Sequence, residues 1–344
     1  MYAIVPAGGV GSRLWPLSRR TSPKFLLDLE GHGRTMLQTT LDRLAGVSDG
    51  IVVVTGESHA AAVTAQLDGV RAEVVAEPSP RDSMAAIGLA AAILHERHGD
   101  VVVGSFAADH AIAHPAAFHA AARTAERIAA EGYVVTIGIA PTAPSSAYGY
   151  IEAGAPLAAP LEGRAVERFE EKPEPSTAAA YLASGRYLWN AGMFVVRTSV
   201  LLDVLAELHP ELHAGLLAIA QAWDTDAREE SLAQHWGTLP RMVIDRAVAE
   251  PVAARGGVAV VPAEMGWSDI GDFEALAELE PRPARLAVDA PGTYARATRP
   301  VVVVGVPGAV VVETEDAILV TTRERAQDVR LAVDALDGDL EGLR

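Results

Sequence analysis

The sequence predicts an α/β protein built on a mostly parallel sheet, and two patterns lead to this fold class. Up to residue 139, short apolar runs alternate with segments of helical periodicity. The apolar runs are continuous, which is typical of parallel strands buried on both faces. The intervening helices supply the crossovers that a parallel sheet requires. A chain of 344 residues is long enough for a large core and about two domains.

The predicted elements of the first part follow in order. The strands are Ala3–Val5, Ile51–Thr55, Ala72–Ala76, Val101–Phe106 and Tyr133–Ile139, and the helices are Met36–Ala45, Ser58–Leu67, Ser83–Glu96 and Pro115–Ala130. This alternation indicates a Rossmann-like sheet, in which ligands bind at the carboxyl ends of the strands. We therefore expect the polar motifs that follow these strands to meet in one crevice.

From about residue 148 the pattern loosens into shorter strands and inserted helices, which we interpret as the second half of the same domain. The proline-rich stretch Glu280–Pro283 marks the expected boundary between a domain of residues 1–280 and a small β-rich domain of residues 281–344. In the small domain, an amphipathic helix over Arg323–Leu336 places Ala326, Val329, Val333 and Leu336 on one side. The strands predicted before it are Val301–Val304, Ala309–Glu313 and Ala317–Thr321.

Composition narrows the classes of function. The net charge of −17 argues against a nucleic-acid binder, which would show a basic surface. No apolar run approaches the ~20 residues of a membrane span, and the first strand begins too early for a signal peptide. The chain has no cysteine, which excludes disulfides and thiolate metal sites and favours a reducing setting. We expect a cytoplasmic protein without nucleic-acid or membrane partners.

A glycine-rich loop directly after the first strand predicts a nucleotide site. Its small residues allow backbone N–H groups to approach a phosphate, and Arg13 and Lys24 add two cations. The dinucleotide fingerprint is excluded because Leu14 stands at its third glycine, and the P-loop is excluded because no Gly-Lys-Ser/Thr follows. The alternative is a simple loop beside two cations. The predicted nucleotide-binding residues here are Ala7, Gly8, Gly9, Gly11, Ser12, Arg13 and Lys24.

A carboxylate, Asp109, follows the strand Val101–Phe106 and should face the same crevice. It would repel a triphosphate unless a cation lies between them. Mg²⁺ suits this position because it takes one or two carboxylates together with phosphate oxygens. The alternative is that Asp109 caps the helix beginning near Pro115. A second carboxylate, Asp269, read alone, would be a cap for a helix over Phe273–Leu279.

The segment after the third strand offers a way to recognise the base. Guanine presents N1–H and N2–H₂ as adjacent donors, and one carboxylate can accept from both. Glu77 is placed to do this, and Ser83 lies in the same nucleotide-binding segment. The rival interpretation is that Asp82 or Ser83 caps the following helix and that backbone groups read the base.

Several strings resemble sugar nucleotidyltransferases, and in particular the mannose-1-phosphate guanylyltransferase branch. They follow the family's order over most of residues 2–275, and the tail resembles the family's small β-helix-like domain. The resembling strings are Val5–Arg19 with its Arg-Leu-Trp-Pro-Leu-Ser-Arg, followed by Ser22–Lys24, and then Tyr148–Tyr150, Phe169–Pro173, Trp189–Phe194, Val243–Val248 and Gly266–Gly271.

The resemblance assigns roles to matching residues. Arg13 would hold the β- and γ-phosphates and Lys24 the α-phosphate, while Asp109 and Asp269 would bind Mg²⁺. Lys172 would contact the phosphate of the sugar 1-phosphate. With it, the residues implied as catalytic are Arg13, Lys24, Asp109 and Lys172, and the implied sugar-binding residues are Gly149, Glu171, Lys172 and Asn190.

Two of the resembling strings are less decisive, one because it has another interpretation and one because it departs from the family's usual residues. The Phe169–Pro173 string is open to interpretation as a surface charge cluster beside a turn. Asp245 is a secondary site candidate, because Arg246 stands where the family usually has tyrosine.

The implied reaction is transfer of GMP. GTP and α-D-mannose 1-phosphate would give GDP-mannose and diphosphate, by in-line attack of the sugar phosphate on the α-phosphorus. The alternatives are another sugar 1-phosphate or nucleoside triphosphate, or a non-catalytic homologue that binds nucleotide sugars. The apolar tail is consistent with a homodimer.

Overall fold

The computed structural model describes residues 1–67 and 69–344. The chain divides into two compact units, and each combines distant stretches of sequence. Unit 1 contains Met1–Gly8, Leu41–Ala107 and Ile112–Trp267, and unit 2 contains Gly9–Thr40, Ala108–Ala111 and Ser268–Arg344. The domain boundary expected near residue 280 stays a prediction.

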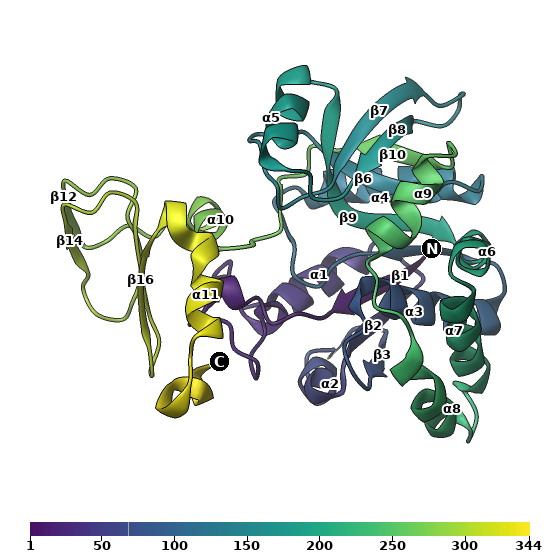
Figure 1. The fold of residues 1–344 in the computed structure, drawn as a ribbon, viewed down its shortest axis with the longest axis horizontal. Helices are drawn as coiled ribbons and strands as arrows, with labels where there is room; N and C mark the ends of the chain where they lie inside the picture. Colours follow the sequence, from purple (N-terminus) through teal and green to yellow (C-terminus); the bar gives the residue numbers. More distant parts are fainter. Residues whose placement is uncertain (68) are drawn as a thin grey trace. The chain divides into compact units, whose positions relative to one another are not determined.

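Unit 1 is built on a nine-stranded sheet in the order β3-β2-β1-β4-β9-β6-β10-β8-β7 (Figure 1). One edge is the parallel block of β3 (Ala72–Glu77), β2 (Gly50–Gly56), β1 (Tyr2–Ala7) and β4 (Val102–Ser105). The long strand β9 (Tyr187–Arg197) is antiparallel to its neighbours β4 and β6. The remaining strands are β6 (Val134–Ile139), β10 (Val258–Pro262), β8 (Arg164–Glu170) and β7 (Tyr150–Pro156). The α/β fold class is confirmed, and the sheet is mixed: the β3-β2-β1-β4 block and the β6–β10 pair are parallel, whereas β9, β8 and β7 pair with their neighbours in antiparallel fashion.

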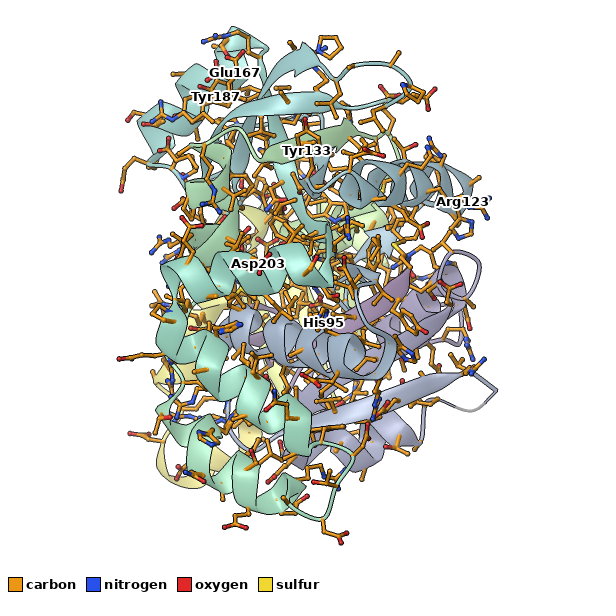
Figure 2. The ribbon with its side chains drawn as sticks, turned by 90° about the vertical axis from the view of Figure 1, so that its right-hand side faces the viewer. His95, Arg123, Tyr133, Glu167, Tyr187 and Asp203 are labelled. Atoms are coloured by element: carbon orange, nitrogen blue, oxygen red, sulfur yellow. The ribbon has the colours of Figure 1, made fainter. Side chains whose placement is uncertain are left out.

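Helix α3 (Asp82–His98) is the most deeply buried helix of unit 1, with every residue from Met84 to Leu94 buried. It packs against α6 (Thr198–Leu208) and α7 (Pro210–Ala222). Gly88 allows this approach, because a Cβ there would lie 2.7 Å from Leu216 Cδ1. Figure 2 views this side, with His95 on α3 and Asp203 on α6 labelled. The other helical segments are α2 (Glu57–Thr64), α4 (Pro115–Ala130), α5 (Pro175–Ser184), α8 (Arg228–His235), η3 (Trp236–Thr238), η4 (Asp245–Ala249) and α9 (Glu250–Ala253).

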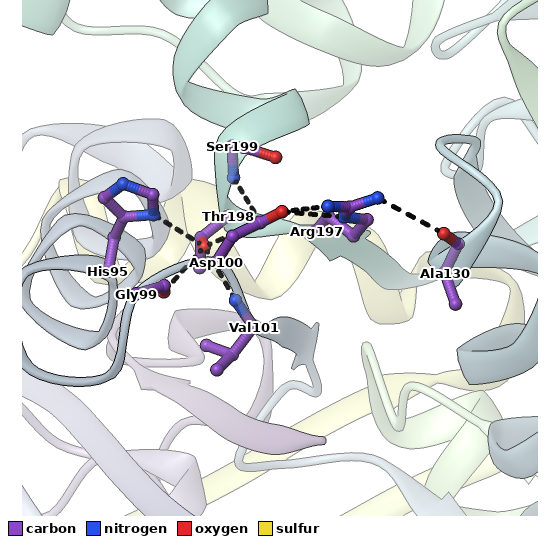
Figure 3. A network of polar contacts seen from close by, with 8 residues as sticks. All are labelled: His95, Gly99, Asp100, Val101, Ala130, Arg197, Thr198 and Ser199. Carbon is purple, nitrogen blue, oxygen red and sulfur yellow. Dashed lines mark hydrogen bonds and ion pairs between the residues drawn. The ribbon is translucent and has the colours of Figure 1, made fainter.

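A polar network around Asp100 joins the end of α3 to the start of α6 (Figure 3). The first turn of α6 has no cap of its own, and Asp100 Oδ1 accepts from the Ser199 N–H at 3.0 Å. Arg197 donates to Asp100 Oδ2, and His95 Nδ1 lies 2.9 Å from Thr198 Oγ1. A carboxylate from a neighbouring loop thus satisfies an orphan donor at the start of the helix.

Unit 2 packs the loop after the first strand against the C-terminal segment. Its core cluster includes Leu14 and Trp15 from the loop, Phe273 from α10 (Phe273–Leu279), and Ala326 and Val329 from the tail. Its helical turns near the N-terminus are η1 (Ser12–Leu14) and η2 (Lys24–Leu26). Its two small sheets are β12 (Leu286–Val288) with β14 (Val302–Val304), and β13 (Tyr294–Arg296) with β15 (Ala309–Glu313) and β16 (Ile318–Thr322).

The predicted amphipathic tail helix is present in two parts, η5 (Arg323–Asp328) and α11 (Val329–Asp334), followed by η6 (Gly338–Leu343). Its predicted apolar side packs on the core cluster of unit 2. The sequence did not predict β12 or β13. Three elements cross a unit boundary along the chain: α1 (Met36–Leu44), β5 (Ala111–Ile112) and β11 (Trp267–Ser268).

Candidate functional site

The glycine loop of unit 2 contains two positions whose backbone conformation only glycine adopts without strain. Gly9 and Gly11 have φ of 82° and 74°, in the left-handed region. A Cβ on Gly11 would lie 2.8 Å from Lys24 Cβ, and the Lys24 N–H donates to the Val10 carbonyl at 3.2 Å. Ser18 Oγ donates to the Gly11 carbonyl at 2.6 Å. The loop therefore closes directly over Lys24.

Lys24 joins the two carboxylate residues predicted for a metal site. Its side chain is 7% exposed, and Nζ lies 2.8 Å from Asp109 Oδ2 and donates to the backbone carbonyl of Asp269. Burial raises the pKa of Asp109, but the charges of Lys24 and His110 outweigh it and hold that pKa below its usual value. Asp109 is thus kept ionised, and three distant stretches of sequence meet at one ammonium group.

The backbone turns sharply at Asp269. The next residue, Ile270, is fully buried yet has φ of 41°, a conformation that is costly for a β-branched side chain. A Cβ on Gly271 would lie 3.1 Å from Asp269 Oδ2 and 3.5 Å from Arg13 Nη2. The Asp269 carboxylate and the Arg13 guanidinium therefore face the same glycine.

The capping alternatives for both carboxylates do not hold. The cap of α10 is Asp272, whose carboxylate accepts from the N–H groups of Glu274 and Ala275. The N-cap residue of α4 is His114, without a side-chain capping bond. Among residues 1–67 and 69–344, no group of three or more His, Cys, Asp or Glu residues is arranged to hold a metal ion. Two carboxylates are a set that Mg²⁺ takes together with phosphate oxygens, so the side-chain types of Asp109 and Asp269 suit the ion, and its binding by these two residues stays a prediction.

Glu77 and Ser83 belong to unit 1. In the described part of the chain, Glu77 Oε1 is buried without a hydrogen-bond partner, and burial raises the pKa of Glu77 to about 7. Ser83 Oγ accepts from the Ile244 N–H at 3.0 Å. Helix α3 has Arg81 as its N-cap residue and no side-chain capping bond, so neither Asp82 nor Ser83 has the capping role of the rival interpretation.

The predicted sugar-binding residues converge in unit 1. A Cβ on Gly149 would lie 2.8 Å from Glu171 Oε2 and 3.4 Å from Asn190 Cβ. Glu171 is nearly buried, and its Oε1 lies 2.7 Å from Nζ of the half-exposed Lys172. Lys172 has φ of 52°, another left-handed residue that is not glycine. An ammonium group thus stands beside the cluster formed by Gly149, Glu171 and Asn190.

The amide of Asn190 is already largely engaged. Its Oδ1 accepts from Thr136 Oγ1 at 2.7 Å and from the Gly192 N–H at 3.1 Å. Its Nδ2 donates to Asp245 Oδ1 at 2.8 Å. The second N–H of Nδ2 is the atom left to donate to a sugar hydroxyl, and the sugar-binding role of Asn190 stays a prediction.

Two further acidic residues, Asp245 and Glu250, contact this cluster. Asp245 begins the π-helical turn η4, and Glu250 Oε1 accepts from the Glu171 N–H at 3.0 Å. Burial, with the nearby charge of Glu171, raises the pKa of Asp245 to about 7.

Motif reasoning missed Thr136 and Glu250, because each contacts another residue of the site. Ala7 and Gly8 belong to unit 1, and Gly9, Gly11, Ser12 and Arg13 belong to unit 2. Assignment of all these residues to substrates stays a prediction.

Comparison with known proteins identifies the family. The family pattern "Nucleotidyl transferase" matches residues 2–284, and "MannoseP isomerase/GMP-like beta-helix domain" matches residues 285–336. The mannose-1-phosphate guanylyltransferase of Escherichia coli is 38% identical over 355 residues, which cover 98% of this chain and 74% of that protein. The xanthan biosynthesis protein XanB of Xanthomonas campestris is 39% identical over 346 residues, covering 96% and 72%.

One solved structure has a similar fold over nearly the whole length of this chain. The crystal structure titled mannose-1-phosphate geranyltransferase, from Thermus thermophilus, has a TM-score of 0.85 and 30% identity, covering 98% of this chain and 99% of that one. Within the described residues, 1–67 and 69–344, no helix combines the length and apolarity that crossing a membrane takes. The C-terminal β-helix-like domain and the resemblance to mannose-1-phosphate guanylyltransferases are confirmed. This chain belongs to the nucleotidyl transferase family, among relatives that include the mannose-1-phosphate guanylyltransferases.

Proposed function

We propose that this protein is a mannose-1-phosphate guanylyltransferase, which converts GTP and α-D-mannose 1-phosphate to GDP-mannose and diphosphate. The observation that carries the proposal is the contact of Lys24 with both Asp109 and Asp269 beneath a glycine loop. The identity of 38% to a mannose-1-phosphate guanylyltransferase over nearly the whole chain supports the choice of substrates.

In the proposed nucleotide site, Arg13 binds the β- and γ-phosphates and the departing diphosphate, and Lys24 binds the α-phosphate. Nucleotidyltransferases of this family generally use a divalent metal, and we assign Mg²⁺ to Asp109 and Asp269. When bound, the ion would neutralise charge on the phosphates. The backbone of the glycine loop contributes further N–H donors, and Glu77 would accept from the guanine edge through its unpartnered Oε1.

In the proposed sugar site, Lys172 holds the phosphate of mannose 1-phosphate and Glu171 accepts from its hydroxyls. The sugar phosphate is already a nucleophile near neutral pH, so no general base is required. Catalysis would then come from alignment for in-line attack and from neutralisation of charge at the α-phosphorus. The left-handed backbone conformation of Lys172 would direct its ammonium group, which stays half-exposed, toward the sugar phosphate.

A diphosphate-release assay tests the proposal. GTP, mannose 1-phosphate and Mg²⁺ together should release diphosphate, and omission of any one should abolish the signal. The same assay is repeated with ATP, CTP, UTP and dTTP, and with glucose 1-phosphate and fucose 1-phosphate. A clear preference for another pair of substrates would replace the proposed activity, and GTP binding without turnover would indicate a non-catalytic homologue.

Setting and assembly remain proposals as well. The cysteine-free sequence favours a cytoplasmic setting. Unit 2 exposes apolar side chains on its small sheets, and they favour a homodimer. The most exposed are Val302, Val304, Ile318 and Val320.

A further inference from the structure

The guanidinium of Arg13 is held by a residue from the far end of the chain. Arg13 Nη1 donates to Gln327 Oε1 at 2.8 Å, although 314 positions separate the two residues. Gln327 lies in η5, within the C-terminal β-helix-like segment. Both residues belong to unit 2, so this contact lies inside one compact unit.

The other end of the Gln327 amide is fixed too. Its Nε2 donates to Asp272 Oδ2, and the opposite oxygen, Asp272 Oδ1, accepts from the N–H groups of Glu274 at 2.8 Å and Ala275 at 3.1 Å. Asp272 is 8% exposed and, as the cap of α10, has little freedom to turn. A chain of hydrogen bonds therefore runs from the first turn of α10 through Gln327 to Arg13.

Packing supports the same arrangement. Ala326, next to Gln327, and Val329 are buried in the cluster that also contains Leu14, next to Arg13. The backbones on both sides of the Arg13–Gln327 contact are thus anchored in one core. The amide and the guanidinium meet without the entropy cost that two free surface side chains would incur.

The residue that contacts Arg13, Gln327, has a neutral side chain, and this affects the charge available for binding. A carboxylate at position 327 would form a stronger contact with Arg13 but would neutralise its charge. An amide oxygen orients the guanidinium and leaves its positive charge available to an anion. The Nη2 side of Arg13 faces Gly271 and the Asp269 carboxylate, so the neutral partner limits the negative charge around the arginine.

We infer that Gln327 is a positioning residue for nucleotide binding, through which the C-terminal segment holds Arg13 ready for the phosphate tail of the triphosphate. The inference rests on the proposed function for the role of Arg13 as a phosphate ligand. Gln327 does not itself contact substrate. Asp272 is held by the first turn of α10, and Gln327 links it to Arg13 by one hydrogen bond to each residue.

The first test compares Gln327→Met with Arg325→Gln. Methionine keeps the length of the side chain and removes both hydrogen bonds. The control breaks only an exposed ion pair of the same η5 segment, between Arg325 Nε and Asp328 Oδ2 at 2.7 Å. Gln327→Met should raise KM for GTP about tenfold, as expected for one lost hydrogen bond to a charged group, with KM for mannose 1-phosphate and the melting temperature nearly unchanged. Arg325→Gln should match the wild type.

The second test is a double-mutant cycle with Arg13→Ala, read by direct GTP titration as well as by turnover. If Gln327 acts through Arg13, Gln327→Met adds nothing to the loss caused by Arg13→Ala. Gln327→Glu should also weaken GTP binding, since it retains the contact but neutralises the charge. Additive losses, or wild-type GTP affinity in Gln327→Met, would overturn the inference.

The two readouts separate this inference from the proposed function. A wild-type protein that binds GTP but does not transfer GMP to mannose 1-phosphate would refute the proposed activity, while the binding cycle would still decide the role of Gln327. A wild-type protein that binds no nucleoside triphosphate would overturn both.

Discussion

Lys24 and Asp109 form an ion pair with 2.8 Å between Nζ and Oδ2, and the lysine side chain in it is only 7% exposed. The ammonium also reaches the carbonyl of Asp269, so a single cation organises both acidic residues of the proposed metal site. A buried charge is tolerated only when it is paired. Stability and chemistry therefore depend on the same contact and should be separable by substitution.

Asp109→Asn should lose both stability and activity. The variant leaves the Lys24 ammonium buried without its ionised partner, at a cost of about 3 kcal/mol in the free energy of unfolding. The double variant Lys24→Met/Asp109→Asn removes both charges and should recover most of that stability while staying inactive. Urea unfolding and diphosphate release, measured on the same preparations, check this. Recovery of activity in the double variant would contradict the proposed roles of both residues.

Glu77 should make GTP recognition depend on pH. Its pKa of about 7 means that the carboxylate is ionised above pH 7 and protonated below, and only the ionised form accepts from both guanine donors. KM for GTP should therefore rise as the pH falls from 8 to 6. Glu77→Gln should flatten this profile and reduce the preference for GTP over ATP about tenfold or more. The control is Glu73→Gln on the same strand, whose carboxylate pairs with Arg97 at 2.6 Å. A preserved GTP preference in Glu77→Gln would show that other groups read the base.

The fold was predictable where one stretch of sequence determines the element. Strand β2 and helix α4 follow the expected ranges because each is a buried apolar run or a strongly amphipathic segment. β12 was not predictable, since its three residues are all exposed and show no periodicity. The place of β9 in the middle of the sheet depends on pairing with β4 and β6, which no local pattern encodes.

The residues of the candidate site also fall into two groups, those that the sequence could indicate and those that only the folded structure reveals. Residues within motifs, such as Lys24, Asp109 and Glu171, could be proposed from the sequence because the chemistry of phosphates and sugars restricts the residue types beside them, and their roles stay predictions. Glu250 and Gln327 were missed because each has an ordinary polar side chain that holds another site residue. Their roles depend on long-range contacts, and only the folded chain reveals these.

Asp245 should make the protein less stable as the pH rises. Its pKa is about 7 in the folded state and about 3.9 unfolded. Between these values the folded state holds a proton that the unfolded state has lost. Its contribution to stability is therefore complete below about pH 3.9, decreases by up to about 1.4 kcal/mol per pH unit, and is lost once the pH has risen through 7.

Urea unfolding at pH 5, 6, 7 and 8 tests this slope. Asp245→Asn imitates the protonated form of Asp245 and should reduce the slope, and Glu77→Gln should reduce it further because burial also raises the pKa of Glu77 to about 7. Asp224→Asn is the control, because hydrogen bonds from Arg97 hold the pKa of Asp224 below its usual value and outside this range. Parallel pH profiles for Asp245→Asn and the wild type would contradict the assignment.

Gly149→Ala should impair sugar binding selectively. The added Cβ would lie 2.8 Å from Glu171 Oε2, at the far end of a flexible side chain, so the fold should tolerate the change while the carboxylate moves. KM for mannose 1-phosphate should rise about tenfold with KM for GTP unchanged, since displacing Glu171 leaves sugar hydroxyls without their acceptor. Gly154→Ala is the matched control, because its Cβ would likewise meet a glutamate, Glu167, at 2.8 Å from Cγ but outside the proposed sugar site. Equal kinetic effects of the two substitutions would assign the change to general distortion of this edge of the sheet, and Glu171 would lose its proposed role.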